Sequence, residues 1–411
     1  MATIDYDYTI ITAWYDVREK ENHELKDDTT NRFFCSPYWY FHSAKQLFEK
    51  PFPMVIFTEP KYKDKILEAR PQHLHAITRF IYRDYDELAF YTYFKQYEEN
   101  HKKNKIQNVT QEKFTALYKF IVNQKVNFVK DTIMMNPFQT EKFAWMDMRL
   151  HCVYDMSIDE TNQVFANMPT DRVKLMQMSY TSPQDIWGRH DFYSWTRGKV
   201  AAGFFGGYRE PLLQFIKLCQ EEFLQSMKEE MTPSDEMIYS FVIAYNHQLF
   251  EPYIGEYGFC LKNLLRTRGS LHLVMPFLQN SFDKGNYNYT KSICNSLRDA
   301  FQCSEIELSA EDIHRTWYYN YIAHVILLDS HADSHADSHV DSHADSHVDS
   351  HADSSPIMFS KDILNEYYEL AKKREDVRNF IKSHTELLQH IKNYIENDKE
   401  YENLHQMVMQ L

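Results

Sequence analysis

The sequence predicts an α/β fold in which a mostly parallel sheet is flanked by helices, followed by a helical appendage at the C-terminus. Short apolar runs typical of buried strands alternate with longer runs of helical periodicity. Hydrophobic residues make up 43% and aromatic residues 15% of the 411 residues, enough to form a substantial core. Glycine occurs only 9 times, which disfavours a loop-rich β-sandwich and favours a helix-rich fold.

Six short apolar segments are expected to be strands. They cover residues 8–13, 54–58, 77–82, 143–148, 173–178 and 200–205. The first of them, YTIITA, is rich in β-branched residues and has no polar alternation, which is typical of a strand covered on both faces. Because helical segments separate most of the strands, parallel pairing with crossover helices is the expected arrangement.

The helical segments show apolar residues at intervals of three and four. They cover residues 43–49, 87–100, 114–133, 212–227 and 237–245. The third is expected to be one long helix that ends before Pro137, since proline cannot continue a helix. Ser234 is the expected N-cap of the last.

The composition divides the chain into three parts. Residues 1–328 are expected to form the globular domain, and residues 356–411 a helical segment through which copies of the chain could associate. Between them, residues 329–355 repeat Asp-Ser-His followed by Ala or Val. A helix with histidine at every fourth position could bind Zn²⁺ or Ni²⁺. A solvated linker is favoured, because Asp and Ser are poor residues for a helix interior.

Charge and the N-terminal segment exclude several classes of function. The formal net charge of −14 disfavours binding to nucleic acid, which requires basic patches. The N-terminus has no basic region before its apolar run, and no window is long enough for a membrane span. The 6 cysteines are scattered, without a CxxC pair. A cytoplasmic protein with reduced thiols is therefore expected.

Polar residues at the ends of the predicted strands are candidates for a ligand site. The apolar run 143–146 ends at Asp147, and Arg149 follows two residues later. Ligands of open α/β sheets bind beyond the carboxyl ends of the strands, and a carboxylate there could hold Mg²⁺ or Mn²⁺ against a diphosphate. Trp14 and Tyr15 follow the first strand and could stack on a base. The alternative is that Asp147 simply begins a surface turn.

Two further stretches carry candidate residues. Gly206 and Gly207 follow an apolar strand, and glycines there could let the backbone approach a ligand closely, or could serve a tight turn and packing. Asp235 and Glu236 begin a predicted helix. They could orient an acceptor hydroxyl or act as a base, or they could stabilise the helix through its dipole.

Four stretches in this order resemble the HtrL/YibB-like family, which is similar to a divergent branch of the GT-A nucleotide-sugar glycosyltransferases. They read YTIITAWYD, MVIFTE, NQKVNFVKDTIMMNPFQTEKFAWMDMR and AGFFGGYREPLLQF, and the Asp235-Glu236 helix start follows them. The third and longest stretch is the most specific. The resemblance implies a GT-A-like, Rossmann-like sheet, a divalent metal (Mn²⁺ or Mg²⁺) and a nucleotide sugar, with UDP as the expected nucleotide.

The resemblance also implies roles for single residues. Asp147 matches the first acid of the metal-binding motif, and Arg149 stands where a second Asp is usual, so that Arg149 could pair with a phosphate instead. A late histidine often completes the metal site, and His247 and His272 are the candidates. The residues expected to contact the nucleotide or its sugar are Ala13, Trp14, Tyr15, Thr58, Lys125, Arg149, Gly206 and Gly207.

The resulting expectation is a glycosyltransferase that moves a sugar from a nucleoside diphosphate to a hydroxyl group of a glycan, protein or lipid. Asp235 or Glu236 is the expected acid/base on the acceptor side. The alternative is a GT-A-like scaffold that binds a nucleotide or glycan without catalysis, or is structural. It is motivated by Arg149 in place of the second acid.

Overall fold

The computed structural model divides the chain into two compact units, Met1–Leu273 and Val274–Leu411. It describes residues 6–21, 36–104, 115–150, 157–195, 199–255, 271–302 and 307–320, together with a few positions beyond. The division comes earlier in the chain than the expected boundary at residue 328. The repeat at 329–355 and most of the segment 356–411 lie outside the described residues.

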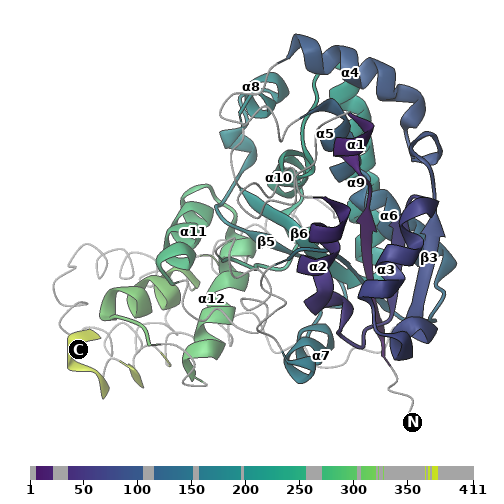
Figure 1. Cartoon of the computed structure of the whole chain (residues 1–411). Helices are drawn as coiled ribbons and strands as arrows, with labels where there is room; N and C mark the ends of the chain where they lie inside the picture. Colours follow the sequence, from purple (N-terminus) through teal and green to yellow (C-terminus); the bar gives the residue numbers. More distant parts are fainter. Residues whose placement is uncertain are drawn as a thin grey trace, which may run out of the picture. The chain divides into compact units, whose positions relative to one another are not determined.

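The first unit contains a sheet of six strands, and all six were predicted. The strands are β1 (Tyr8–Trp14), β2 (Met54–Thr58), β3 (Thr78–Tyr82), β4 (Lys142–Met146), β5 (Lys174–Gln177) and β6 (Val200–Tyr208). Their order across the sheet is β3-β2-β1-β4-β6-β5. Figure 1 labels the two outermost strands, β3 and β5, on opposite sides of the sheet. The strands β1 to β4 run parallel, and β6 pairs antiparallel with both β4 and β5.

The strand order creates a topological switch point between β1 and β4. From β1 the chain moves outward through β2 to β3, and it then returns to β4 on the other side of β1. The chain therefore leaves β1 and β4 toward opposite edges of the sheet, and ligands of open α/β sheets bind beyond the carboxyl ends of strands at such a position. Trp14 ends β1 and Asp147 directly follows β4, so both lie at this edge.

Helices cover both faces of the sheet. The longer helices of the first unit are α2 (Pro37–Phe48), α3 (Lys63–Ala69), α4 (Phe94–Lys103), α5 (Ala116–Val122), α6 (Lys125–Met135), α7 (Ile158–Ala166), α9 (Arg209–Lys228) and α10 (Asp235–Tyr245). Buried residues of α5, α6, α9 and α10 form one apolar core with alternate strand residues. Residues of α2, α3 and α7 form a second core on the opposite face.

The predicted long helix over residues 114–133 is wrong in one respect, because it is two helices. The amide of Asn123 donates to the carbonyl of Lys119 and also to that of Pro233, at 2.8 and 2.9 Å. A side-chain amide bonded in this way competes with continuation of the helix. The break matters for the site because it makes Lys125 the first residue of α6.

The second unit contains most of helix α11 (Leu271–Asp283), which begins just before the division, and all of helix α12 (Tyr287–Gln302). Buried apolar residues recur along both helices, which fall within the expected domain 1–328 and not within the expected helical segment 356–411. Among the helices of the described residues, none has the length and apolar character needed to cross a bilayer.

Candidate functional site at the carboxyl edge of the sheet

Asp147 is fixed at the carboxyl end of β4 by its own backbone and by a neighbouring side chain. Its N–H donates to the carbonyl of Gly203 at 2.8 Å, which extends the pairing of β4 with β6 by one residue. The indole N–H of Trp145 donates to Oδ1 of Asp147 at 2.7 Å. Residues two apart in a strand share a face, which is why Trp145 can reach this carboxylate.

Lys125 connects Asp147 to Asp235. Its Nζ lies 3.0 Å from Oδ1 of Asp147 and 2.8 Å from Oδ2 of Asp235. It also donates to the carbonyl of Ala202 at 3.1 Å. An ammonium group has three N–H donors, and three oxygen atoms of the protein lie within 3.1 Å of this one. Lys125 was expected to reach the nucleotide, and it could do so only by giving up one of these partners.

Three buried side chains hold the turn that precedes α10 and thereby place Asp235. Lys119 donates to the carbonyl of Thr232 at 2.7 Å, while Tyr97 and Asn123 donate to that of Pro233 at 3.0 and 2.9 Å. Buried carbonyls need such partners. Ser234 is the N-cap residue, as predicted, but its side chain makes no capping hydrogen bond.

The electrostatics of the cluster follow from its burial. Burial lowers the pKa of Lys125, but the carboxylates of Asp147 and Asp235 outweigh this and hold it well above its usual value. Burial raises the pKa of Asp235, although Lys125 acts in the opposite direction. Asp235 is 6% exposed at its side chain and Asp147 is 37% exposed. Asp147 is therefore the carboxylate that a ligand from solvent can meet.

Aromatic side chains lie at the same edge, on the α2 side of the sheet. The ring of Trp14 lies 4.1 Å from that of Tyr40, centroid to centroid, and Tyr40 in turn lies beneath the guanidinium of Arg149 at 5.3 Å. A stacked guanidinium next to aromatic rings is suited to a phosphate and a planar base. The sequence placed Trp14 and Arg149 at this edge but gave no role to Tyr40, although it belongs to an aromatic-rich stretch.

Gly206 and Gly207 do not lie at this edge. Both are inside β6, and the antiparallel register pairs them with Ala144 and Phe143, toward the opposite end of β4 from Asp147. A Cβ atom on Gly206 would lie 2.9 Å from the Cβ of Ala144. They are packing glycines within a strand and not a ligand loop. The glycine beside Asp147 is Gly203, which stands in the same sequence stretch.

The two candidate histidines do not join Asp147. His247 follows the C-terminal end of α10, and the length of that helix separates it from Asp235 by about 15 Å. Its ring stacks on Tyr180 at 5.0 Å, and burial lowers its pKa to about 4. His272 is exposed on α11. In the part of the chain that the structure describes, no three His, Cys, Asp or Glu side chains gather around a possible metal position.

These residues do not fit the expected metal site. The point at which Asp147 and Asp235 converge is taken by the Lys125 ammonium, and among the described residues neither candidate histidine joins the two acids. Mn²⁺ or Mg²⁺ as a cofactor stays a prediction from the resemblance, with no set of ligands among the residues proposed for it.

The remaining predicted site residues lie partly in the core and partly at the surface. Ala13 is partly buried and packs against the core on the α6 face. Tyr15 is also in that core, where its ring stacks on Phe128 at 5.8 Å. Thr58 is fully buried opposite Trp14 in the register. Glu236, in contrast, is partly exposed in the first turn of α10.

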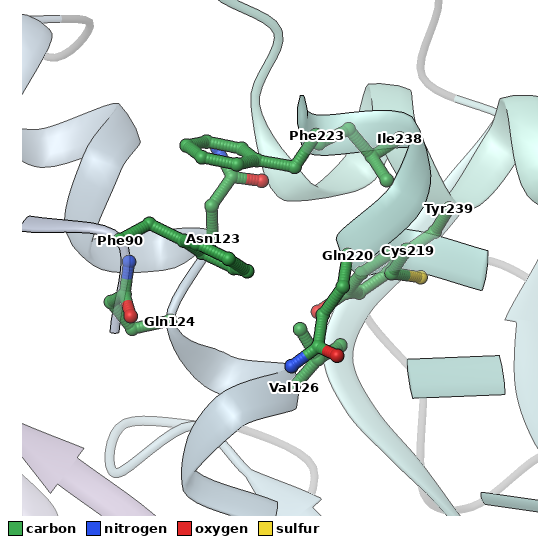
Figure 2. A pocket seen from close by; sticks show the side chains of 9 residues that line it. All are labelled: Phe90, Asn123, Gln124, Val126, Cys219, Gln220, Phe223, Ile238 and Tyr239. Carbon is green, nitrogen blue, oxygen red and sulfur yellow. The ribbon is translucent and has the colours of Figure 1, made fainter. Parts of the chain in front are cut away.

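A separate hollow of about 10 Å³, room for about one water molecule, lies between the α5–α6 break and the helices α9 and α10. Figure 2 shows Asn123 and Gln124 on one side of it and Cys219 and Gln220 on the other. Sites for drug-sized ligands occupy roughly 300–1,000 Å³. The hollow is thus too small for a nucleotide sugar.

Comparison with known protein families matches residues 6–264 to the model of HtrL_YibB, described as a bacterial protein of unknown function. The chain belongs to the HtrL_YibB family. The match covers Lys125, Asp147 and Asp235 and ends before His272. The family thus spans the candidate site but supplies no activity for it. A search of curated proteins finds no match to this chain.

Proposed function

We propose that this HtrL_YibB protein is a glycosyltransferase of the GT-A type. It transfers a sugar from a nucleoside diphosphate, with UDP as the expected nucleotide, to a hydroxyl group of a glycan, protein or lipid. The observation that carries the proposal is the meeting of Asp147, Lys125 and Asp235 at the switch point of a mostly parallel sheet. Charged groups brought together at such a position are typical of a ligand site.

Different side chains at the edge bind different parts of the donor. Trp14 and Tyr40 offer aromatic faces to the base, and Arg149 offers a guanidinium to the diphosphate. Asp147 presents its exposed carboxylate oxygen, since Oδ1 already accepts from Trp145 and Lys125. It anchors the donor by accepting hydrogen bonds from sugar hydroxyls.

The acceptor side is assigned to the start of α10. Asp235 is buried and paired with Lys125, so its role is to hold that ammonium in place. Glu236 is the more exposed of the two acids. It takes the proton from the acceptor hydroxyl as the new glycosidic bond forms and the nucleoside diphosphate leaves.

A second candidate is a protein that binds a nucleotide or glycan without catalysis. It is favoured by the surroundings of Lys125, whose ammonium already has three oxygen atoms of the protein within 3.1 Å. Transition-state charge is stabilised by groups aimed at the reacting atoms. If Lys125 keeps its three partners within the protein, it can attract an anionic ligand electrostatically but does not contact it directly.

The two candidates are distinguished by turnover and binding measured on the same protein. UDP release from a panel of UDP-sugars is followed by chromatography, and UDP binding is measured by calorimetry. We expect slow donor hydrolysis by the wild type and its loss, by at least about 100-fold, in Asp147→Ala. The matched control is Asp171→Ala, which removes an exposed aspartate outside the site.

Wild-type turnover in Asp147→Ala would overturn the assignment of this residue. Binding of UDP without turnover, with any of the sugars and with added acceptors, would favour the binding protein. Absence of both binding and turnover would contradict a nucleotide site at this edge altogether. Circular dichroism of each variant shows whether a loss comes from the site or from unfolding.

A further inference from the structure

The two carboxylates of the cluster converge on a single point. Asp147 comes from the end of β4 and Asp235 from the start of α10, yet their oxygens lie 3.0 and 2.8 Å from one nitrogen atom. Two acids that approach the same point need a positive charge between them, because like charges at this distance repel strongly. The positive charge here is the ammonium of Lys125.

A divalent ion held by both acids would need the same point. Mg²⁺ binds carboxylate oxygens at about 2.0–2.1 Å, so an ion bridging these two carboxylates would overlap the Nζ of Lys125. The ammonium would have to leave, and it is held by three acceptors in a side chain that is only 9% exposed. The position is therefore already filled by a cation that belongs to the chain.

The surroundings keep Lys125 in this position. It stands at the first residue of α6, directly after the break that Asn123 makes. Its ammonium lies 5.7 Å from the centre of the Trp145 ring, and Trp145 donates to the same oxygen of Asp147 that Lys125 contacts. The lysine, the indole and the carboxylate thus support one another.

We propose that Lys125 is a resident cation that takes the place of a divalent metal between Asp147 and Asp235. The site binds its nucleotide without a metal bridging these two acids, and the expected metal dependence is absent. The part of this inference that concerns nucleotide rests on the proposed function. The part that concerns the metal does not, and it is tested without any nucleotide.

The first experiment counts Mn²⁺ ions bound by the full-length protein, using electron paramagnetic resonance of free Mn²⁺. Wild type and Asp147→Asn are compared, so that any ions bound elsewhere, including at the histidine repeat, cancel. We expect the same number of bound ions in both. One more tightly bound ion in the wild type than in Asp147→Asn would overturn the proposal.

A second pair of variants tests whether a divalent ion binds between the two acids once the Lys125 ammonium is removed. Lys125→Met opens the position between the acids and should gain one Mn²⁺ ion, and Lys125→Met with Asp147→Asn should lose it again. No gain in a folded Lys125→Met would contradict a cation position at this point. If Lys125→Met fails to fold, the comparison of wild type with Asp147→Asn still decides.

The third measurement uses UDP as the probe, in the presence of either EDTA or Mn²⁺. We expect dissociation constants that agree within about threefold in the two conditions. A tenfold weaker affinity in EDTA that disappears in Asp147→Asn would overturn the resident-cation proposal. If UDP does not bind in either condition, the proposed nucleotide-binding function is wrong. The number of bound Mn²⁺ ions still tests the role of Lys125 in that case.

Discussion

The ammonium nitrogen of Lys125 lies 2.8 Å from Oδ2 of Asp235, and the two side chains are 9% and 6% exposed. They come from different helices, α6 and α10, which pack on the same face of the sheet. A buried pair of this kind adds little stability compared with apolar side chains of similar size, but removing one partner is costly. The cost of each single substitution should therefore exceed that of the double one.

Asp235→Leu should lower the free energy of unfolding by about 3 kcal/mol. This is the lower end of the range for breaking a buried pair, because Asp147 still faces Lys125. Lys125→Met together with Asp235→Leu should recover most of the loss, since no buried charge then lacks a partner and Asp147 is partly hydrated. Urea unfolding of the wild type, both single variants and the double variant gives the coupling energy. Additive effects would argue against the pair.

Gly206→Ala should lower stability without changing UDP binding, whereas Gly203→Ala should weaken UDP binding at a small cost in stability. At Gly206 a Cβ atom would lie 2.9 Å from the Cβ of Ala144 and 3.2 Å from the carbonyl oxygen of Phe143. Such overpacking within a strand should cost about 1–3 kcal/mol, measured by urea unfolding. UDP binding by the folded fraction of Gly206→Ala should be unchanged. A loss of UDP binding without a loss of stability would show that Gly206 belongs to the ligand site.

At Gly203 the nearest atom to a new Cβ is Cδ1 of Leu150, at 2.8 Å, and Oδ2 of Asp147 lies 3.5 Å away. The end of a leucine side chain can move, so we expect a small stability cost. The new methyl group then contacts the exposed oxygen of Asp147 and covers part of it, so UDP affinity should fall several-fold by calorimetry. Unchanged affinity would place the ligand away from Asp147.

Stability should rise with pH above neutral because of Lys119. Burial lowers the pKa of this lysine from 10.5 to about 7 in the folded protein. Between these values the unfolded chain binds more protons than the folded one, so the free energy of unfolding increases as the pH rises from about 7 toward 10.5. Urea unfolding at several pH values measures the slope, which Lys119→Met should reduce. The exposed Lys63→Met is the control, and an equal slope in all three proteins would refute the assignment.

All six strands were predictable because they depend on local patterns, whereas helices α3, α7, α11 and α12 were not predicted. Each of the six strands is a short apolar run, and β2 was predicted with the observed bounds. The break between α5 and α6 was not predicted. The apolar stripe continues through it, and the hydrogen bond from Asn123 to Pro233 that accompanies the break joins segments far apart in the chain.

The sequence by itself determined where the strands lie, that Asp147 ends one of them, and to which family the chain belongs. These follow from residue type and neighbouring residues. Only the tertiary structure decided that Lys125 and Asp235 meet Asp147, that Gly203 rather than Gly206 lies beside it, and that His247 lies apart. Ion pairs, strand register and helix length decide which residues distant in the sequence come together, and a local sequence pattern does not show this. The cation at this edge of the sheet is therefore a property of the fold.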